Sequence, residues 1–146
     1  MRARRTFAAA ATLVAAAGIG TLVAPSAALA VSASGLCGSG YHNIDSHQLK
    51  HNGTLVGTIY LSYNGSTDCV VTEKDTLTSV RTYVDAYLEP EGSSASFDAD
   101  AYYSYAGPVK ATAPGVCIFW GGSVSGGADP GDSWYVAWDS PRSHCG

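Results

Sequence analysis

The stretch GTIYLSYNGSTDCVVT, residues 57–72, decides the fold class because it combines two strand-like runs with a turn. Its first run contains Thr58-Ile59-Tyr60-Leu61, and β-branched and aromatic residues of this kind are enriched in strands. The Asn64-Gly65 pair that follows is a strong signal for a tight hairpin turn. We therefore expect a hairpin with strands at Thr54–Tyr63 and Cys69–Thr72.

The rest of the chain repeats this pattern, with clusters of Gly, Asn, Asp, Ser and Pro between short strand-like runs. Only Ser46–His51 has some helical character, over one or two turns. Ser79–Leu88 alternates cleanly, with Thr82, Val84, Ala86 and Leu88 expected on one side and Arg81, Tyr83, Asp85, Tyr87 and Glu89 on the other. Further strands are expected at Ala99–Tyr105, Val109–Ala113, Val116–Trp120 and Trp134–Trp138, with a turn at Gly107-Pro108 and a glycine-rich loop from Gly121 to Asp132.

These runs predict an all-β fold, namely a small antiparallel β-sandwich or barrel of about seven or eight short strands. The first thirty residues are different and have the three parts of a secretory signal peptide. Three arginines precede an uncharged apolar run, which ends in the small residues Ala28-Leu29-Ala30. A membrane anchor is the alternative, but the run is rich in Ala and Gly and Pro25 interrupts it. We expect residues 1–30 to be a signal peptide and residues 31–146 to be a single secreted β domain.

The expected mature chain is acidic, because removal of residues 1–30 leaves five Lys and Arg residues against twelve Asp and Glu, a net charge of −7. Nucleic acids and anionic lipids both require a concentrated positive surface. We therefore expect neither nucleic acid nor, after cleavage, a membrane as a partner.

All four cysteines lie in the expected mature chain, at Cys37, Cys69, Cys117 and Cys145. An even number of cysteines in a small exported domain indicates disulfides. A zinc site is the alternative, but the sequence separations of 32, 48 and 28 are unlike the short-spaced pairs of structural zinc sites. We expect the pairs Cys37–Cys69 and Cys117–Cys145, because these would fix two chain ends that carry few apolar residues.

Residues that could carry catalysis or bind a metal occur without a recognisable motif. His42, His47 and His51 are close in sequence, but they lie in a polar segment and are expected in solvent. Asp98/Asp100 and Asp129/Asp132 could bind calcium only weakly, and the second pair is first of all a good turn sequence. Serines follow glycines at Ser39 and Ser123 without the G-x-S-x-G pattern, and nothing places a serine against His144. We therefore expect no catalytic residues, no metal and no cofactor.

Aromatic residues are the most suggestive feature of the sequence. Rings on an exposed sheet face could stack on sugar rings or on a partner protein, whereas rings in a small sandwich more often fill the core. We expect Trp120, Trp134 and Trp138 in the core, and we regard Tyr83 and Tyr87 as a possible binding face. Asn52-Gly53-Thr54 and Asn64-Gly65-Ser66 fit the glycosylation sequon but are better interpreted as Asn-Gly turns.

The chain resembles the spore-associated protein A family. The resemblance rests on Cys37-Gly38-Ser39-Gly40-Tyr41, on Gly57–Asn64 with Cys69–Thr72, on Tyr105–Val109 with Cys117–Gly122, and on the terminal His144-Cys145-Gly146. It implies a small exported protein of a spore-forming actinobacterium that is found with the spore surface, and it carries no catalytic residues over to this chain.

We therefore expect a secreted, monomeric, non-catalytic protein associated with a component of the cell or spore surface. The first alternative is an extracellular carbohydrate- or protein-binding module, which an exposed aromatic strip would favour. The second, less favoured, is a small secreted hydrolase, which a pocket joining a histidine, a buried carboxylate and a serine would favour.

Signal peptide cleavage gives the first testable prediction. The secreted protein should begin at Val31, or at Ser34 if the small residues after Ala30 direct cleavage there instead. Intact-mass analysis of secreted material would measure this, and a retained 1–30 segment would support the membrane-anchor alternative.

Overall fold

The computed structural model describes residues 31–146, so the expected signal peptide lies outside the described residues. The domain is all-β apart from one short helix, as the sequence predicts, and its eight strands form two four-stranded antiparallel sheets. In chain order, the elements are α1 (Ala33–Cys37), β1 (His42–His51), β2 (Thr54–Tyr63), β3 (Asp68–Lys74), β4 (Thr82–Pro90), β5 (Ser96–Tyr102), β6 (Tyr105–Ala111), β7 (Ile118–Ser125) and β8 (Tyr135–Asp139).

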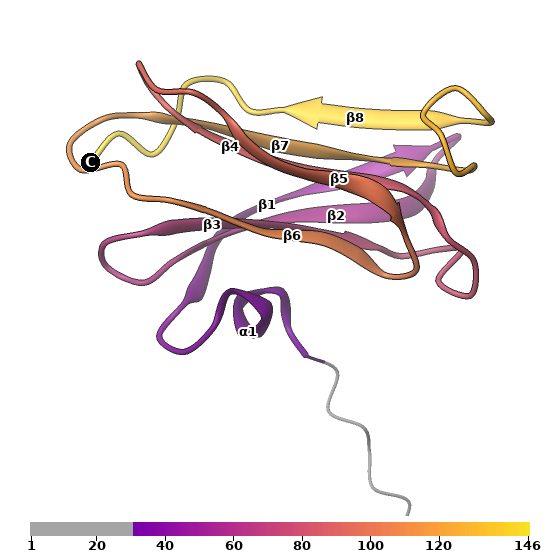
Figure 1. Ribbon diagram of the computed structural model, residues 1–146, viewed down its shortest axis with the longest axis horizontal. Coiled ribbons are helices and arrows are strands. Elements are labelled where there is room, and N and C mark those ends of the chain that lie inside the picture. The colour runs from indigo at the N-terminus through magenta and orange to yellow at the C-terminus, as the bar shows by residue number, and fades with distance from the viewer. Residues whose placement is uncertain (1–30) are drawn as a thin grey trace, which may run out of the picture.

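The two sheets pack face to face as a sandwich, which settles the choice between sandwich and barrel (Figure 1). The first sheet has the strand order β1-β2-β3-β6, and the second has the order β5-β4-β7-β8. The apolar core lies between them, because alternate residues of each strand point inward. Its largest fully buried members are Trp120, Leu49, Ile59, Leu61, Leu88 and Ile118.

The N-terminal segment covers part of the outer face of the first sheet (Figure 1). Ser32 caps α1 by accepting a hydrogen bond from the Gly35 backbone N–H. The disulfide Cys37–Cys69 joins α1 to β3, and Ala33 and Val71 are buried beside it in a second small cluster. Figure 1 shows no corresponding element among residues 31–146 over the outer face of the second sheet.

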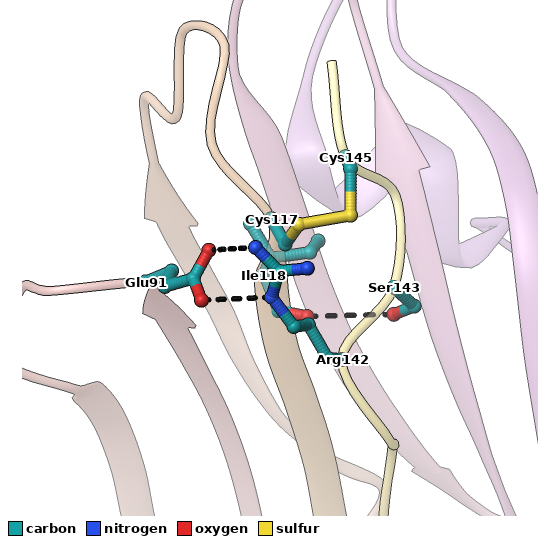
Figure 2. A network of polar contacts seen from close by, with 6 residues as sticks. All are labelled: Glu91, Cys117, Ile118, Arg142, Ser143 and Cys145. Atoms are coloured by element: carbon teal, nitrogen blue, oxygen red, sulfur yellow. Dashed lines mark hydrogen bonds and ion pairs between the residues drawn. A yellow bond between two sulfur atoms is a disulfide. The ribbon is translucent and has the colours of Figure 1, made fainter.

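The C-terminal tail is attached to β7 and its neighbours by several contacts (Figure 2). Cys117 and Cys145 form the second disulfide, so both predicted pairings are confirmed. Between them, Ile118 and Ser143 exchange backbone hydrogen bonds of 2.9 and 3.1 Å. Arg142 adds a bidentate ion pair to Glu91, with N–O distances of 2.6 and 2.7 Å.

The prediction for Ser46–His51 was wrong, because this segment belongs to the ten-residue strand β1. β1 is an edge strand whose only fully buried residue is Leu49, so its sequence lacks the apolar alternation of a half-buried strand. It pairs with β2 through the two-residue turn Asn52-Gly53, in which both residues have positive φ. The Asn-Gly interpretation of this site is therefore confirmed.

Other boundaries also differ from the prediction, and the strand expected at Ala99–Tyr105 in fact contains the end of β5 and its turn into β6. The segment 121–125 was expected in a glycine-rich loop but is part of β7. Its glycines allow other atoms to pack closely against the strand, since a Cβ on Gly122 would lie 2.2 Å from Thr72 Oγ1. Gly107-Pro108, expected as a turn, lies inside β6. β6 is an edge strand with a register irregularity at this point, which is where a sheet tolerates proline.

The second disulfide closes a loop with a sequence separation of 28 residues. Replacing both Cys117 and Cys145 by Ala should lower the free energy of unfolding by about 3–4 kcal/mol, because the bond restricts the unfolded chain. Urea denaturation of the oxidised proteins would measure this. A double variant as stable as the parent would show that the noncovalent contacts of the tail are sufficient.

Candidate binding surface

The outer face of the second sheet carries the two tyrosines that the sequence singled out. The alternation predicted for β4 is confirmed: Thr82, Val84, Ala86 and Leu88 are buried, and Tyr83, Asp85, Tyr87 and Glu89 are half-buried on the opposite side. We call this outer surface of β5-β4-β7-β8 the aromatic face.

The register of the strands aligns Phe97, Tyr87, Gly121 and Asp139 in one row across the sheet. A Cβ on Gly121 would lie 2.6 Å from Tyr87 Cε1, so glycine allows the tyrosine ring to lie close to the β7 backbone. Burial raises the pKa of Tyr87, and the Asp139 carboxylate raises it further. Phe97, at the end of the row, is 73% exposed.

The next row has short side chains, with Asp85 and Ser123 flanked by Ala99 and Ala137. Ser123 is buried and donates its hydroxyl hydrogen to the Asp85 carboxylate. Burial raises the pKa of Asp85, although hydrogen bonds from Ser123 and Tyr83 oppose the shift. The centre of the face is therefore a partly desolvated carboxylate held by the Ser123 hydroxyl group.

A second aromatic pair lies on the other side of Asp85. The ring centroids of Tyr83 and Tyr135 are 6.4 Å apart, and Tyr135 is 47% exposed. Burial and the neighbouring Asp85 raise the pKa of Tyr83 to about 12, so its phenol stays protonated at neutral pH.

The chemistry of this face suits neutral or cationic ligands. Aromatic rings lie on both sides of Asp85, and Glu89 and Asp139 add further carboxylates. Arg81, beside β4, donates through Nε to the Ala101 carbonyl at 2.7 Å. The face thus provides stacking surfaces and hydrogen-bond acceptors, and its charge disfavours anionic polymers.

His47 and His51 are partly buried, which corrects the prediction for them, whereas His42 is exposed as predicted. His47 stacks on Trp138 with a centroid distance of 4.1 Å, and His51 stacks on Trp134 at 5.1 Å. Burial lowers the pKa of His47, against the opposing charge of Asp45. The stacks join β1 to β8 and so close one edge of the sandwich. The spacing of four between His47 and His51 could have indicated that both histidines lie on one face of the sheet, because residues i and i+4 share a face in a strand as well as in a helix.

The tryptophans divide between the core and this edge. Trp120 is 1% exposed and lies in the core, as predicted. Trp134 and Trp138 are only partly buried and pack against the core from the edge.

The acidic pairs have structural contacts. Asp98 accepts hydrogen bonds from the Tyr102 hydroxyl and the Gly107 N–H, both at 2.7 Å. Asp132 accepts one from the Asp129 N–H within the predicted turn. Within residues 31–146, no cluster of three or more His, Cys, Asp or Glu side chains is arranged to hold a metal ion.

The remaining candidates for hydrolysis do not come together. His144 Nε2 lies 3.0 Å from Asp45 Oδ2, and the two residues are 99 positions apart, so sequence reasoning could not have paired them. Ser123 contacts Asp85 on the aromatic face instead. The described part of the chain also contains no helix long and apolar enough to cross a membrane.

Comparison with known proteins identifies one relevant similarity. The chain is 40% identical over 122 residues to spore-associated protein A of Streptomyces coelicolor, and the match covers 77% of this chain and 76% of that protein. No family model matches the chain. No solved structure shows significant similarity to it.

The contact between Gly121 and Tyr87 can be tested by substitution. Gly121→Ala should lower the free energy of unfolding by about 1–3 kcal/mol, because the new methyl group would lie 2.4 Å from the Trp138 carbonyl oxygen and would also displace the Tyr87 ring. Urea denaturation would measure the loss. Gly131→Ala is the matched control, since its Cβ meets no atom within 4 Å. Equal stability of the two variants would contradict the close packing described here.

Proposed function

The chain belongs to the spore-associated protein A family, and we propose that it is a secreted, non-catalytic protein that attaches to the spore or cell surface through its aromatic face. It acts as a monomer without a cofactor, and its partner is a component of that surface. The main observation in support is the half-buried aromatic and acidic face of β5-β4-β7-β8, which no element of residues 31–146 covers.

The contrast between the two sheets supports this proposal. The first sheet uses α1 and the Cys37–Cys69 disulfide to cover apolar residues on its outer side. The second sheet leaves Phe97 73% and Tyr135 47% exposed. Large apolar side chains gathered on one face of a small protein commonly mark an interaction surface.

The residues around His144 support the proposal that the protein is not catalytic. Its nearest charged partner is Asp45, and the cavity beside it is lined by Ile44, Tyr63, Asp68, Ala113, His144, Cys145 and Gly146. Within the described residues, this lining contains no serine or threonine, and the sulfur of Cys145 is in a disulfide. A histidine–carboxylate pair needs a nucleophile or a bound water in position before it can hydrolyse a substrate.

The alternative of a carbohydrate- or protein-binding module relies on the same face. Stacking rings beside the hydrogen-bond acceptors Asp85 and Asp139 would suit a polysaccharide, in which apolar sugar faces alternate with hydroxyl groups. Surface attachment and ligand binding are then one activity, with the surface component as the ligand.

Binding to isolated spore and cell envelopes of the organism that encodes the chain tests this proposal. The double variant Tyr83→Ala/Phe97→Ala should bind at least about tenfold more weakly, because a few large aromatic side chains dominate such interfaces. Co-sedimentation of labelled protein would measure the affinity. Tyr103→Ala is the control, since Tyr103 is 56% exposed but lies outside the aromatic face.

Two results would overturn the proposal. Unchanged binding of the double variant would exclude the aromatic face as the attachment surface. Release of soluble sugars or peptides from the envelopes by the parent protein, abolished in His144→Ala, would show that the protein is catalytic. Protease treatment of the envelopes distinguishes a protein partner from a polysaccharide.

A further inference from the structure

A separate cavity of about 250 Å³ lies where the C-terminal tail meets the β2–β3 turn. Tyr63 and Asp68 border it from this turn, Ile44 from β1, and His144 and Cys145 from the tail. It is smaller than the pockets that usually hold drug-sized ligands, so it would fit only a small group or a single side chain.

Asp68 is the unusual residue of this cavity. It is only 8% exposed, and its carboxylate accepts no hydrogen bond and forms no ion pair with any of residues 31–146, although its oxygens are not fully enclosed and open onto the cavity. Burial raises its pKa, and the nearby charge of His144 only partly opposes the shift. A largely buried carboxylate usually has a partner, and the cavity is the free space next to Asp68 that could hold one.

Among the lining residues, His144 can carry a positive charge, but it is hydrogen-bonded elsewhere. His144 Nε2 lies 3.0 Å from Asp45 Oδ2, and the disulfide from Cys145 to Cys117 fixes the tail beside it (Figure 2). His144 therefore forms a wall of the cavity, and its hydrogen bond is made to Asp45 and not to Asp68. The other walls, Ile44, Tyr63 and Ala113, are largely apolar and would contact methylene groups.

We propose that this cavity binds an alkylammonium group, with Asp68 as the acceptor of the charged amine. A primary ammonium group supplies the donors and the positive charge that Asp68 lacks, and its alkyl chain matches the apolar walls. The amine is either a lysine side chain of a partner protein or a free alkylamine, since both present the same group. The cavity is distinct from the aromatic face, so this inference does not depend on the proposed function.

Titration of the folded protein with N-acetyl-lysine methylamide and with cadaverine tests the inference. Amide chemical shifts around Asp68 and His144, followed by NMR, give the dissociation constants. Tighter binding of the lysine derivative indicates a protein partner, and tighter binding of cadaverine indicates a free amine. N-acetyl-norleucine methylamide, which lacks the ammonium group, should not bind.

Two variants make the experiment decisive. Asp68→Asn should weaken binding at least about tenfold, since a hydrogen bond to a charged group is lost, whereas Asp100→Asn at an exposed position of β5 should not. If Asp68→Asn does not fold, Ile44→Lys serves instead, because Ile44 is 37% exposed and a lysine there would occupy the cavity with its own amine. Absence of binding by the parent protein, or undiminished binding by the folded variants, would overturn the inference.

Discussion

The sandwich depends on the close approach of its two sheets at Thr72 and Gly122. A Cβ on Gly122 would lie 2.2 Å from Thr72 Oγ1 and 2.4 Å from the Asp85 carbonyl oxygen, so only glycine fits. The approach leaves the Thr72 hydroxyl buried without a hydrogen-bond partner among the described residues. An orphaned hydroxyl costs about 1–3 kcal/mol, and the surrounding packing of Trp120 and the aliphatic core must offset that cost.

The two disulfides attach both chain ends to the sheets around this core. Cys37–Cys69 holds a helix of five residues, which is too short to be stable alone. Cys117–Cys145 holds a tail whose Ser143 forms an isolated bridge with Ile118 of β7. These attachments have different consequences, because the helix covers one sheet whereas the tail creates a cavity.

The sequence predicted the features that depend on local chemistry, and it predicted the disulfides that attach the two chain ends. Asn-Gly pairs marked both hairpins of the first sheet, the alternation of Ser79–Leu88 identified β4, and the sparse apolar content of the ends indicated the disulfide pairing. It failed where a residue's usual preference was overridden by tertiary contacts. β1 is polar because it lies at an edge, and the glycines of β7 signal close packing where glycine more often signals a loop.

The candidate sites could be predicted only in part, for a related reason. Tyr83 and Tyr87 were found because alternation within one strand determines which side chains share a face. Phe97, Tyr135 and Asp139 were missed because their positions beside these tyrosines depend on the register of three strand pairs. Asp45 and His144 are still more remote, and only the folded tail brings them together.

The aromatic face also shows why a small domain would retain partly buried carboxylates. Asp85 is fixed by Ser123 and Tyr83, while Gly121 fits closely beneath the Tyr87 ring. Side chains held in this way lose little conformational freedom when a ligand binds, so more of the contact energy contributes to affinity. The raised pKa of Asp85 indicates that the carboxylate is held at a cost to the folded state. An apolar residue at the same position would pack without that cost, so the carboxylate is consistent with the binding role that we propose for this face.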